Sequence, residues 1–195
     1  MSSPGSLEDQ LDVTYRYFSH HIRTCTSVVV AMLDAVAEGL TDESMTAMIM
    51  ESGYLLDIYD RGMSVCFNHI LKKPHDLDME SVDLGHLLDL YIKNAVSAES
   101  SVQIENNVGS VHVFCDAYSF KSLFQILLQE ALSSAKKKLT VTLDSAVLTV
   151  IPDGGLNEIQ KIFPIFAEIL KRSGIMMEYD RSCIKLRFKD ESIDS

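Results

Sequence analysis

The residues best suited to chemistry are two adjacent histidines, His20 and His21, which lie within a long helical pattern. In a heptad frame Phe18 and Ile22 point into the helix packing, so His20 lies opposite the apolar side and should be exposed. His21 lies one step round the helix, nearer the flank. The pattern therefore predicts His20 as the residue that is available to a partner or a ligand.

Three neighbours of His20 should lie beside it on the same helix face. Arg16 precedes it by four residues, and Arg23 and Thr24 follow it by three and four. Two guanidinium groups and a hydroxyl around one imidazole are suited to holding a phosphoryl group. The alternative interpretation is an ordinary helix surface on which His20 is a bystander.

The same outward face continues toward the end of the helix with small side chains. Its members are Ser27, Val28, Val30 and Ala31, of which the two valines are apolar and expected to be exposed. Exposed apolar residues on a smooth face are typical of a protein-docking surface, although an ordinary helix surface is again the alternative.

Two long helices are expected to position these residues. The first begins at a Ser6 cap and runs to about Gly39; the second begins at Thr41 or Asp42 and runs to about Lys72. Apolar seams with steps of four and three follow both helices, at Leu11, Tyr15, Phe18, Ile22, Cys25, Val29, Met32 and Val36, and at Met45, Ile49, Ser52, Leu56, Tyr59, Met63, Cys66 and Ile70. Because a lone hairpin leaves half of this apolar surface in water, we expect a homodimeric four-helix bundle.

After this hairpin the pattern mixes helices and strands, which indicates an α+β fold with domains over residues 1–75 and 76–195. The second domain should be a mixed sheet covered on one face by helices. Its helices are expected over 82–98, 116–137 and 156–172, the last bent near Pro164. Its strands are expected over 102–105, 111–115, 139–143, 146–151, 175–179 and 183–188, and the last residues, 190–195, should be frayed.

Composition excludes several classes of function. The 195 residues hold 17 Lys and Arg against 28 Asp and Glu, a net charge of −11, which disfavours binding to nucleic acid or an anionic membrane. No zinc-like spacing links the four cysteines, which we expect to be buried and reduced. With neither a signal peptide nor an apolar run of membrane-spanning length, the protein is expected to be cytoplasmic.

The stretch around His20 resembles the phosphoacceptor box of bacterial two-component histidine kinases. That box reads Ser-His-Glu-Leu-Arg-Thr-Pro-Leu, and this chain has Ser19-His20-His21-Ile22-Arg23-Thr24-Cys25-Thr26. Weaker matches follow in the family's order: the start of the ATP-binding domain over 82–102, the Asn-box helix over 116–135, a damaged DxGxG box at 153–155 and the phenylalanine box at 162–166. The resemblance implies a phosphoacceptor role for His20 and an ATPase-like second domain that is degenerate.

The chain departs from that family where ATP would bind. His21 replaces the acid after the phosphoacceptor, and the magnesium-binding Asn position falls at about Ser133, with Gln129 one turn earlier. The family's glycine-rich ATP lid is absent, because only a few residues separate Gly155 from the phenylalanine box. The resemblance therefore implies no cradle for a triphosphate, and we expect no ATP, no other cofactor bound by this chain and no autokinase activity.

What remains of the resemblance implies a histidine phosphotransferase. His20 Nε2 would take a phosphoryl group from the aspartate of one response-regulator receiver domain and give it to another, while Arg16 and Arg23 offset the charge and the receiver supplies Mg²⁺. Three alternatives stay open: a non-catalytic scaffold or binding protein of a two-component system, a receiver phosphatase in which Thr24 orients water, and a residual histidine kinase.

Overall fold

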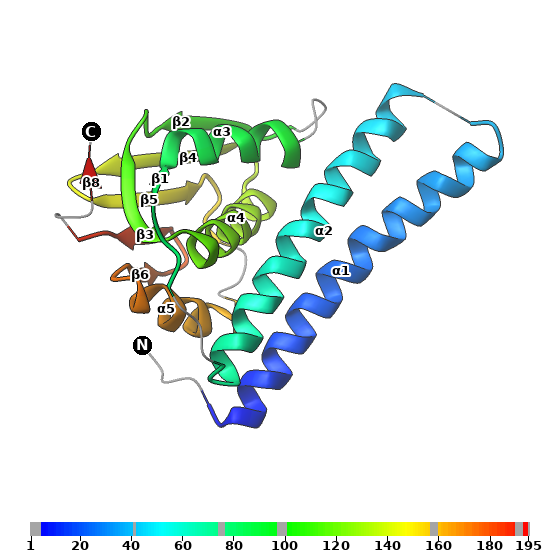
Figure 1. The fold of residues 1–195 in the computed structure, drawn as a ribbon. Coiled ribbons are helices and arrows are strands. Elements are labelled where there is room, and N and C mark those ends of the chain that lie inside the picture. Colours follow the sequence, from blue (N-terminus) through cyan, green and yellow to red (C-terminus); the bar gives the residue numbers. More distant parts are fainter. Residues whose placement is uncertain are drawn as a thin grey trace.

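The protein has the α+β fold that the sequence predicts, with a helical hairpin followed by an α/β sheet domain (Figure 1). The computed structural model describes residues 5–40, 42–73, 77–96, 101–156 and 160–189, and the backbone of 193–194. The expected domain boundary, between residues 75 and 76, falls within residues 74–76, which lie outside the described residues. None of the described helices is long and apolar enough to cross a bilayer.

The first helix, α1 (Leu7–Ala37), starts at the predicted cap. The Ser6 hydroxyl accepts a hydrogen bond from the Asp9 amide at 3.2 Å, and Asp9 Oδ2 accepts one from the Ser6 amide at 2.9 Å. This reciprocal capping box satisfies two backbone N–H groups at the helix start, so the helix begins where its apolar pattern begins. Gly39, with φ +83°, provides the left-handed residue of the turn that follows.

The second helix, α2 (Glu43–Ile70), is capped by Asp42, whose carboxylate accepts a hydrogen bond from the Met45 amide at 2.8 Å. α2 runs back along α1, and the far end of the hairpin projects beyond the α/β domain (Figure 1). This arrangement confirms the predicted antiparallel pair of long helices.

The heptad seams are only partly buried within one chain. Phe18, Cys25 and Tyr59 are buried as expected, whereas Tyr15 is 58% exposed and Val36 is 41% exposed. One hairpin therefore leaves part of its apolar seam uncovered.

The α/β domain contains two sheets, where the sequence predicted one. The larger sheet has the order β2-β4-β5-β7-β6 and is antiparallel except for the β2–β4 pair. Its strands are β2 (Gln103–Asn107), β4 (Lys138–Asp144), β5 (Val147–Pro152), β6 (Met176–Tyr179) and β7 (Ile184–Arg187). The smaller antiparallel sheet has the order β1-β3-β8, from β1 (Met79–Asp83), β3 (His112–Asp116) and β8 (Ile193–Asp194).

Both outer strands of the smaller sheet differ from the prediction. The helix expected from residue 82 is α3 (Leu84–Ala95), because the preceding residues form β1 and Asp83 caps the helix instead. The segment expected to fray ends in β8, which pairs with β3. Both strands belong to the smaller sheet, whose pairing partners are distant in sequence.

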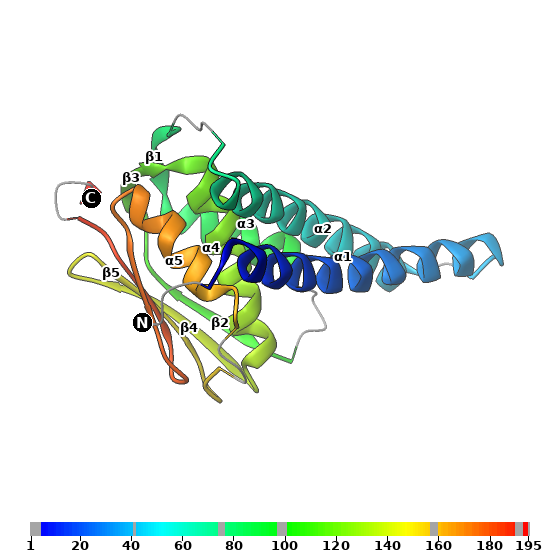
Figure 2. The same cartoon turned by 90° about the horizontal axis from the view of Figure 1, so that it is seen from below.

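Three helices lie between the larger sheet and the hairpin, as Figure 2 shows. They are α3, α4 (Ala117–Ser134) and α5 (Phe163–Arg172), and α2 packs against all three. Gly62 of α2 lies close against α4, because a Cβ there would collide with the Ile126 side chain of that helix. α5 starts later than predicted, with Pro164 in its first turn, where a missing N–H costs no helical hydrogen bond; the proline therefore does not bend it.

Candidate functional site

His20 is exposed on α1, as the heptad frame predicts, and faces an open cleft of about 520 Å³. α1 forms one wall of the cleft, and the short segment that precedes α5 forms the other. The described lining residues are Asp12, Val13, Arg16, Tyr17, His20 and His21 on the first wall, and Gln160, Lys161 and Ile162 on the second. The sequence alone did not indicate this second wall.

Only one of the three predicted neighbours of His20 lines the cleft with it. Arg16 does so, with a side chain that is 77% exposed and donates from Nε to Asp12 Oδ1 at 2.8 Å. Arg23 and Thr24 are exposed on α1 outside the lining, and the Thr24 hydroxyl donates to the backbone carbonyl of His20 at 3.0 Å. In this conformation Thr24 bonds to its own helix.

The expected docking face lies further along α1. Ser27, Val30 and Ala31 are exposed, with Val30 at 50%, and Val28 is half-buried. The face is thus accessible within one chain and continuous in sequence with the His20 region.

His21 is turned into the junction between the hairpin and the α/β domain. Its ring stacks on Tyr59 with centroids 4.5 Å apart and contacts Tyr17 at 4.6 Å, and its Nε2 lies 3.4 Å from Glu130 Oε1. Burial, with a smaller contribution from the neighbouring His20, lowers the pKa of His21 from 6.5 to about 4. At neutral pH the contact with Glu130 is therefore made by a neutral imidazole.

Glu130 of α4 is the centre of this junction. Its Oε1 accepts a hydrogen bond from the Tyr17 hydroxyl at 2.6 Å, and its Oε2 accepts one from Gln160 Nε2 at 2.9 Å. Burial raises the pKa of Glu130, and the hydrogen bonds from Tyr17 and Gln160 oppose that rise. The carboxyl group thus joins α1, α4 and the second wall of the cleft. Sequence analysis missed it, although an acid within an otherwise apolar helix was a usable signal.

This junction predicts how stability depends on pH. Because the folded protein holds the pKa of His21 near 4, the unfolded chain takes up that proton first, and the free energy of unfolding should fall between about pH 6.5 and pH 4. We expect a loss of about 2 kcal/mol after allowing for the exposed part of the ring. Glu130 acts in the opposite direction, since its raised pKa favours the folded state at low pH.

Urea unfolding at several pH values measures this slope. His21→Phe keeps a ring against Tyr59 and removes the titrating group, so its stability should change less over the same window. An unchanged slope in His21→Phe would assign the pH dependence to other groups.

Three side chains match the positions of the ATP-binding motifs in the histidine kinases that this sequence resembles. Each of them makes hydrogen bonds within the chain. Gln129 Oε1 accepts a hydrogen bond from the Tyr91 hydroxyl at 2.6 Å, and the Ser133 hydroxyl donates to the Gln129 carbonyl at 2.9 Å. Asp153 accepts from the backbone amides of Lys136 and Lys137 at 2.7 and 3.1 Å. None of these three positions is an Asn, and the Asp153 carboxylate is engaged by backbone amides.

The described residues include no group of three or more His, Cys, Asp or Glu side chains that could hold a metal ion. All four cysteines, Cys25, Cys66, Cys115 and Cys183, are free and buried, as expected. Burial raises the pKa of Cys115 to about 12 and also raises that of Cys66, so neither thiol is a reactive thiolate.

Solved structures of similar fold include two histidine kinases. The Acinetobacter baumannii histidine kinase AdeS has a TM-score of 0.55 and 14% identity, over 87% of this chain and 97% of that chain. The cytoplasmic segment of histidine kinase QseC has a TM-score of 0.53 and 19% identity, over 68% and 94%. A bacterial phosphotransferase has a TM-score of 0.51 and 15% identity, over 95% and 98%.

No protein-family model and no curated protein sequence matches the chain. The likeness is therefore one of fold, and it extends over the hairpin and the sheet domain together. The protein has a histidine-kinase-like fold, in which a helical hairpin precedes an ATPase-like α/β domain.

Proposed function

We propose that this protein is a histidine phosphotransferase of a two-component phosphorelay, with His20 as its phosphoacceptor. The observation that carries the proposal is the exposed His20 imidazole on an open cleft between the two parts of the fold, with the Arg16 side chain on the same wall. Within the described part of the chain no side chain hydrogen-bonds the His20 ring. The ring of His21 lies beside it, with 5.4 Å between the two centroids.

The transfer step needs little from this protein beyond an accessible nucleophile. A lone pair on His20 Nε2 attacks the phosphorus of a receiver phosphoaspartate, so the N–P bond forms while the P–O bond to the carboxylate breaks. The carboxylate leaves with the electron pair, and His20 keeps its Nδ1 proton. The reverse step on a second receiver regenerates neutral His20, and the receiver's acidic pocket and Mg²⁺ stabilise the charge in both steps.

The proposal assigns no ATP to this chain. Support comes from the internal hydrogen bonds of Gln129 and Asp153, which occupy the side chains that would otherwise meet a nucleotide. We expect titration calorimetry with Mg-ATP to give no saturable heat at millimolar concentration. Asp153→Ala, which removes the bonds to the Lys136 and Lys137 amides, should lower stability and leave the calorimetric trace unchanged. A saturating isotherm in the wild type would instead favour the residual-kinase alternative.

The proposal includes a homodimer formed through the hairpin. Its support is the set of large apolar side chains left exposed over residues 30–50 of the hairpin, namely Val30, Leu33, Val36, Leu40, Met48 and Met50. The far end of the hairpin projects beyond the α/β domain (Figure 1). Such a concentration of exposed apolar side chains is typical of an interaction surface. A second hairpin would cover the seam side of this surface, which includes Val36, and leave the docking face of Ser27, Val28, Val30 and Ala31 to a receiver domain.

The proposed partners are the receiver domains of response regulators in the cytoplasm, without nucleic acid or membrane. Mixing the protein with labelled phospho-receivers from the same genome tests the function. Label that moves to His20 and on to a second receiver supports the relay. Release of inorganic phosphate that requires Thr24 would favour the phosphatase, and binding without loss of label would favour the scaffold.

A further inference from the structure

We infer that Lys161 is a second cation of the phosphoryl site, reaching His20 from the opposite wall of the cleft. The inference rests on the proposed phosphotransfer at His20 and adds a residue from the α/β domain to it. The ligand chemistry is that of a phosphoryl dianion, whose oxygens need positive charge on more than one side.

The charged side chains that line the cleft indicate that a second cation is needed to hold a phosphoryl group there. Among its described lining residues, Arg16 and Lys161 are the basic side chains that carry a positive charge at neutral pH, and Asp12 is the acidic one. Arg16 Nε forms an ion pair with Asp12 Oδ1 at 2.8 Å, so the positive charge on the α1 wall is partly neutralised. Lys161 is exposed, and among the residues that the structure describes it has no ion-pair partner.

The backbone that carries Lys161 is anchored on both sides. Gln160 donates from Nε2 to the buried Glu130 at 2.9 Å, and its carbonyl accepts a hydrogen bond from the Phe163 amide at 3.0 Å. Ile162 on the other side is 1% exposed. A lysine between two fixed neighbours keeps its Cα at the rim of the cleft while its side chain remains free to reach a ligand.

The same junction fixes the wall that carries His20. The Glu130 carboxylate, which accepts the hydrogen bond from Gln160, also accepts one from the Tyr17 hydroxyl of α1 at 2.6 Å. One buried carboxyl group therefore sets the spacing between the histidine wall and the lysine wall. Arg23, the second cation expected from the sequence, does not line this cleft, and Lys161 takes its place.

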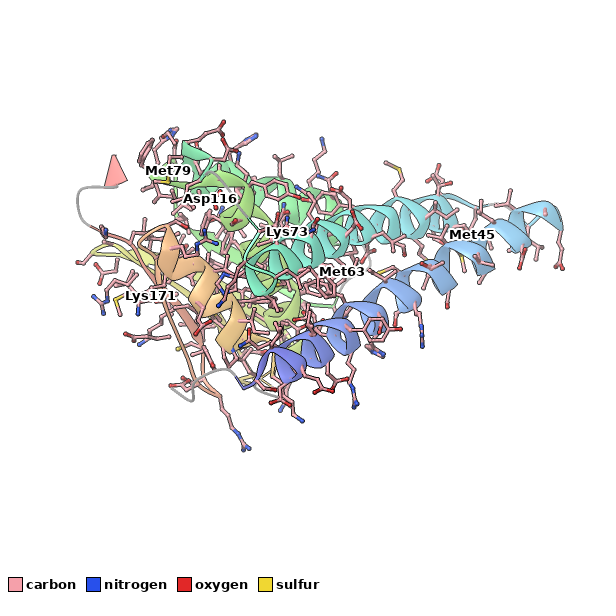
Figure 3. All side chains as sticks on the ribbon, turned by 60° about the horizontal axis from the view of Figure 1, so that its bottom comes forward. Met45, Met63, Lys73, Met79, Asp116 and Lys171 are labelled. Atoms are coloured by element: carbon pink, nitrogen blue, oxygen red, sulfur yellow. The ribbon has the colours of Figure 1, made fainter. Side chains whose placement is uncertain are left out.

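Single-turnover transfer from a phosphorylated receiver tests the role of Lys161. Lys161→Gln should lower the rate roughly tenfold and lower the ratio of phosphorylated to free His20 at equilibrium by a similar factor. Lys161→Arg keeps the charge and should restore most of both quantities. Lys171→Gln is the matched control, because Lys171 is an exposed lysine of α5 outside the cleft lining and should behave as the wild type (Figure 3).

Gln160 is assigned as the positioning residue of Lys161, and a double-mutant cycle tests it. Gln160→Leu should slow transfer in the wild-type background and have little further effect in Lys161→Gln, because its contribution runs through the lysine. An equal loss in both backgrounds would mean that Gln160 acts through general stability, which the unfolding midpoint reports independently.

The outcomes separate this inference from the proposed function. If the wild type transfers label and Lys161→Gln matches Lys171→Gln in rate and equilibrium, Lys161 has no part in the site while the phosphotransferase proposal stands. If the wild type takes up no label at His20, both proposals are overturned.

Discussion

A His20→Ala protein should accept no label from a phosphorylated receiver while folding as the wild type does. His20 is exposed, and its ring lies 5.4 Å from the ring of His21 between centroids, so its removal costs little stability. The loss of transfer should be complete, because the other imidazole on the α1 wall, that of His21, is stacked on Tyr59 and turned toward Glu130. Phosphohistidine detection on the separated protein, together with circular dichroism, measures both effects.

His21 is the neighbour that makes this experiment decisive. His21→Phe keeps an aromatic ring stacked on Tyr59 and should retain most of the transfer, since His21 serves the junction with Glu130. Label that survives in His20→Ala and disappears in His21→Phe would show that the helical frame is wrong by one residue. Survival in both variants would reject phosphotransfer at this site.

Val36→Asp should convert the proposed dimer into monomers. Val36 belongs to the apolar seam of α1 and is 41% exposed in a single chain, so a second hairpin is expected to cover it. A carboxylate in an apolar interface costs about 2 kcal/mol per copy, and because a symmetric dimer contains two, Kd should rise roughly a thousandfold. Sedimentation equilibrium over a concentration series measures this change.

Ala37→Asp is the matched control for that substitution. Ala37 is the next residue of α1, exposed and off the seam, and it places the same charge near the same helix end. We expect it to leave the dimer intact. A wild-type protein that sediments as a monomer at micromolar concentration would contradict the dimer altogether.

The hairpin could be predicted from the sequence because its signals are local. The Ser6–Asp9 capping box and the Asp42 cap mark the starts of α1 and α2, and both were found where the pattern places them. β1 and β8 could not be predicted in the same way. Each is short, and each exists because it pairs with β3, a partner that no local pattern identifies.

In the candidate site, too, local features could be predicted from the sequence and long-range contacts could not. Helical periodicity predicts that His20 is exposed, because that property depends on which side of α1 faces the core. Helical spacing also groups Arg23 and Thr24 with His20, yet it contains no information about where the second wall of the cleft stands. The Tyr17–Glu130 hydrogen bond joins residues 113 positions apart, and a contact of that range follows only from the folded chain.

The separation of the two walls in sequence has a consequence for the newly made chain. The hairpin leaves the ribosome well before Glu130 and Gln160 have been synthesised, and contacts of such range form late in folding. An unfinished chain can therefore display His20 on a formed helix, but with only one wall of its cleft. Under the proposed function, a receiver domain that requires both walls would exchange phosphoryl groups with the complete protein and not with the unfinished chain.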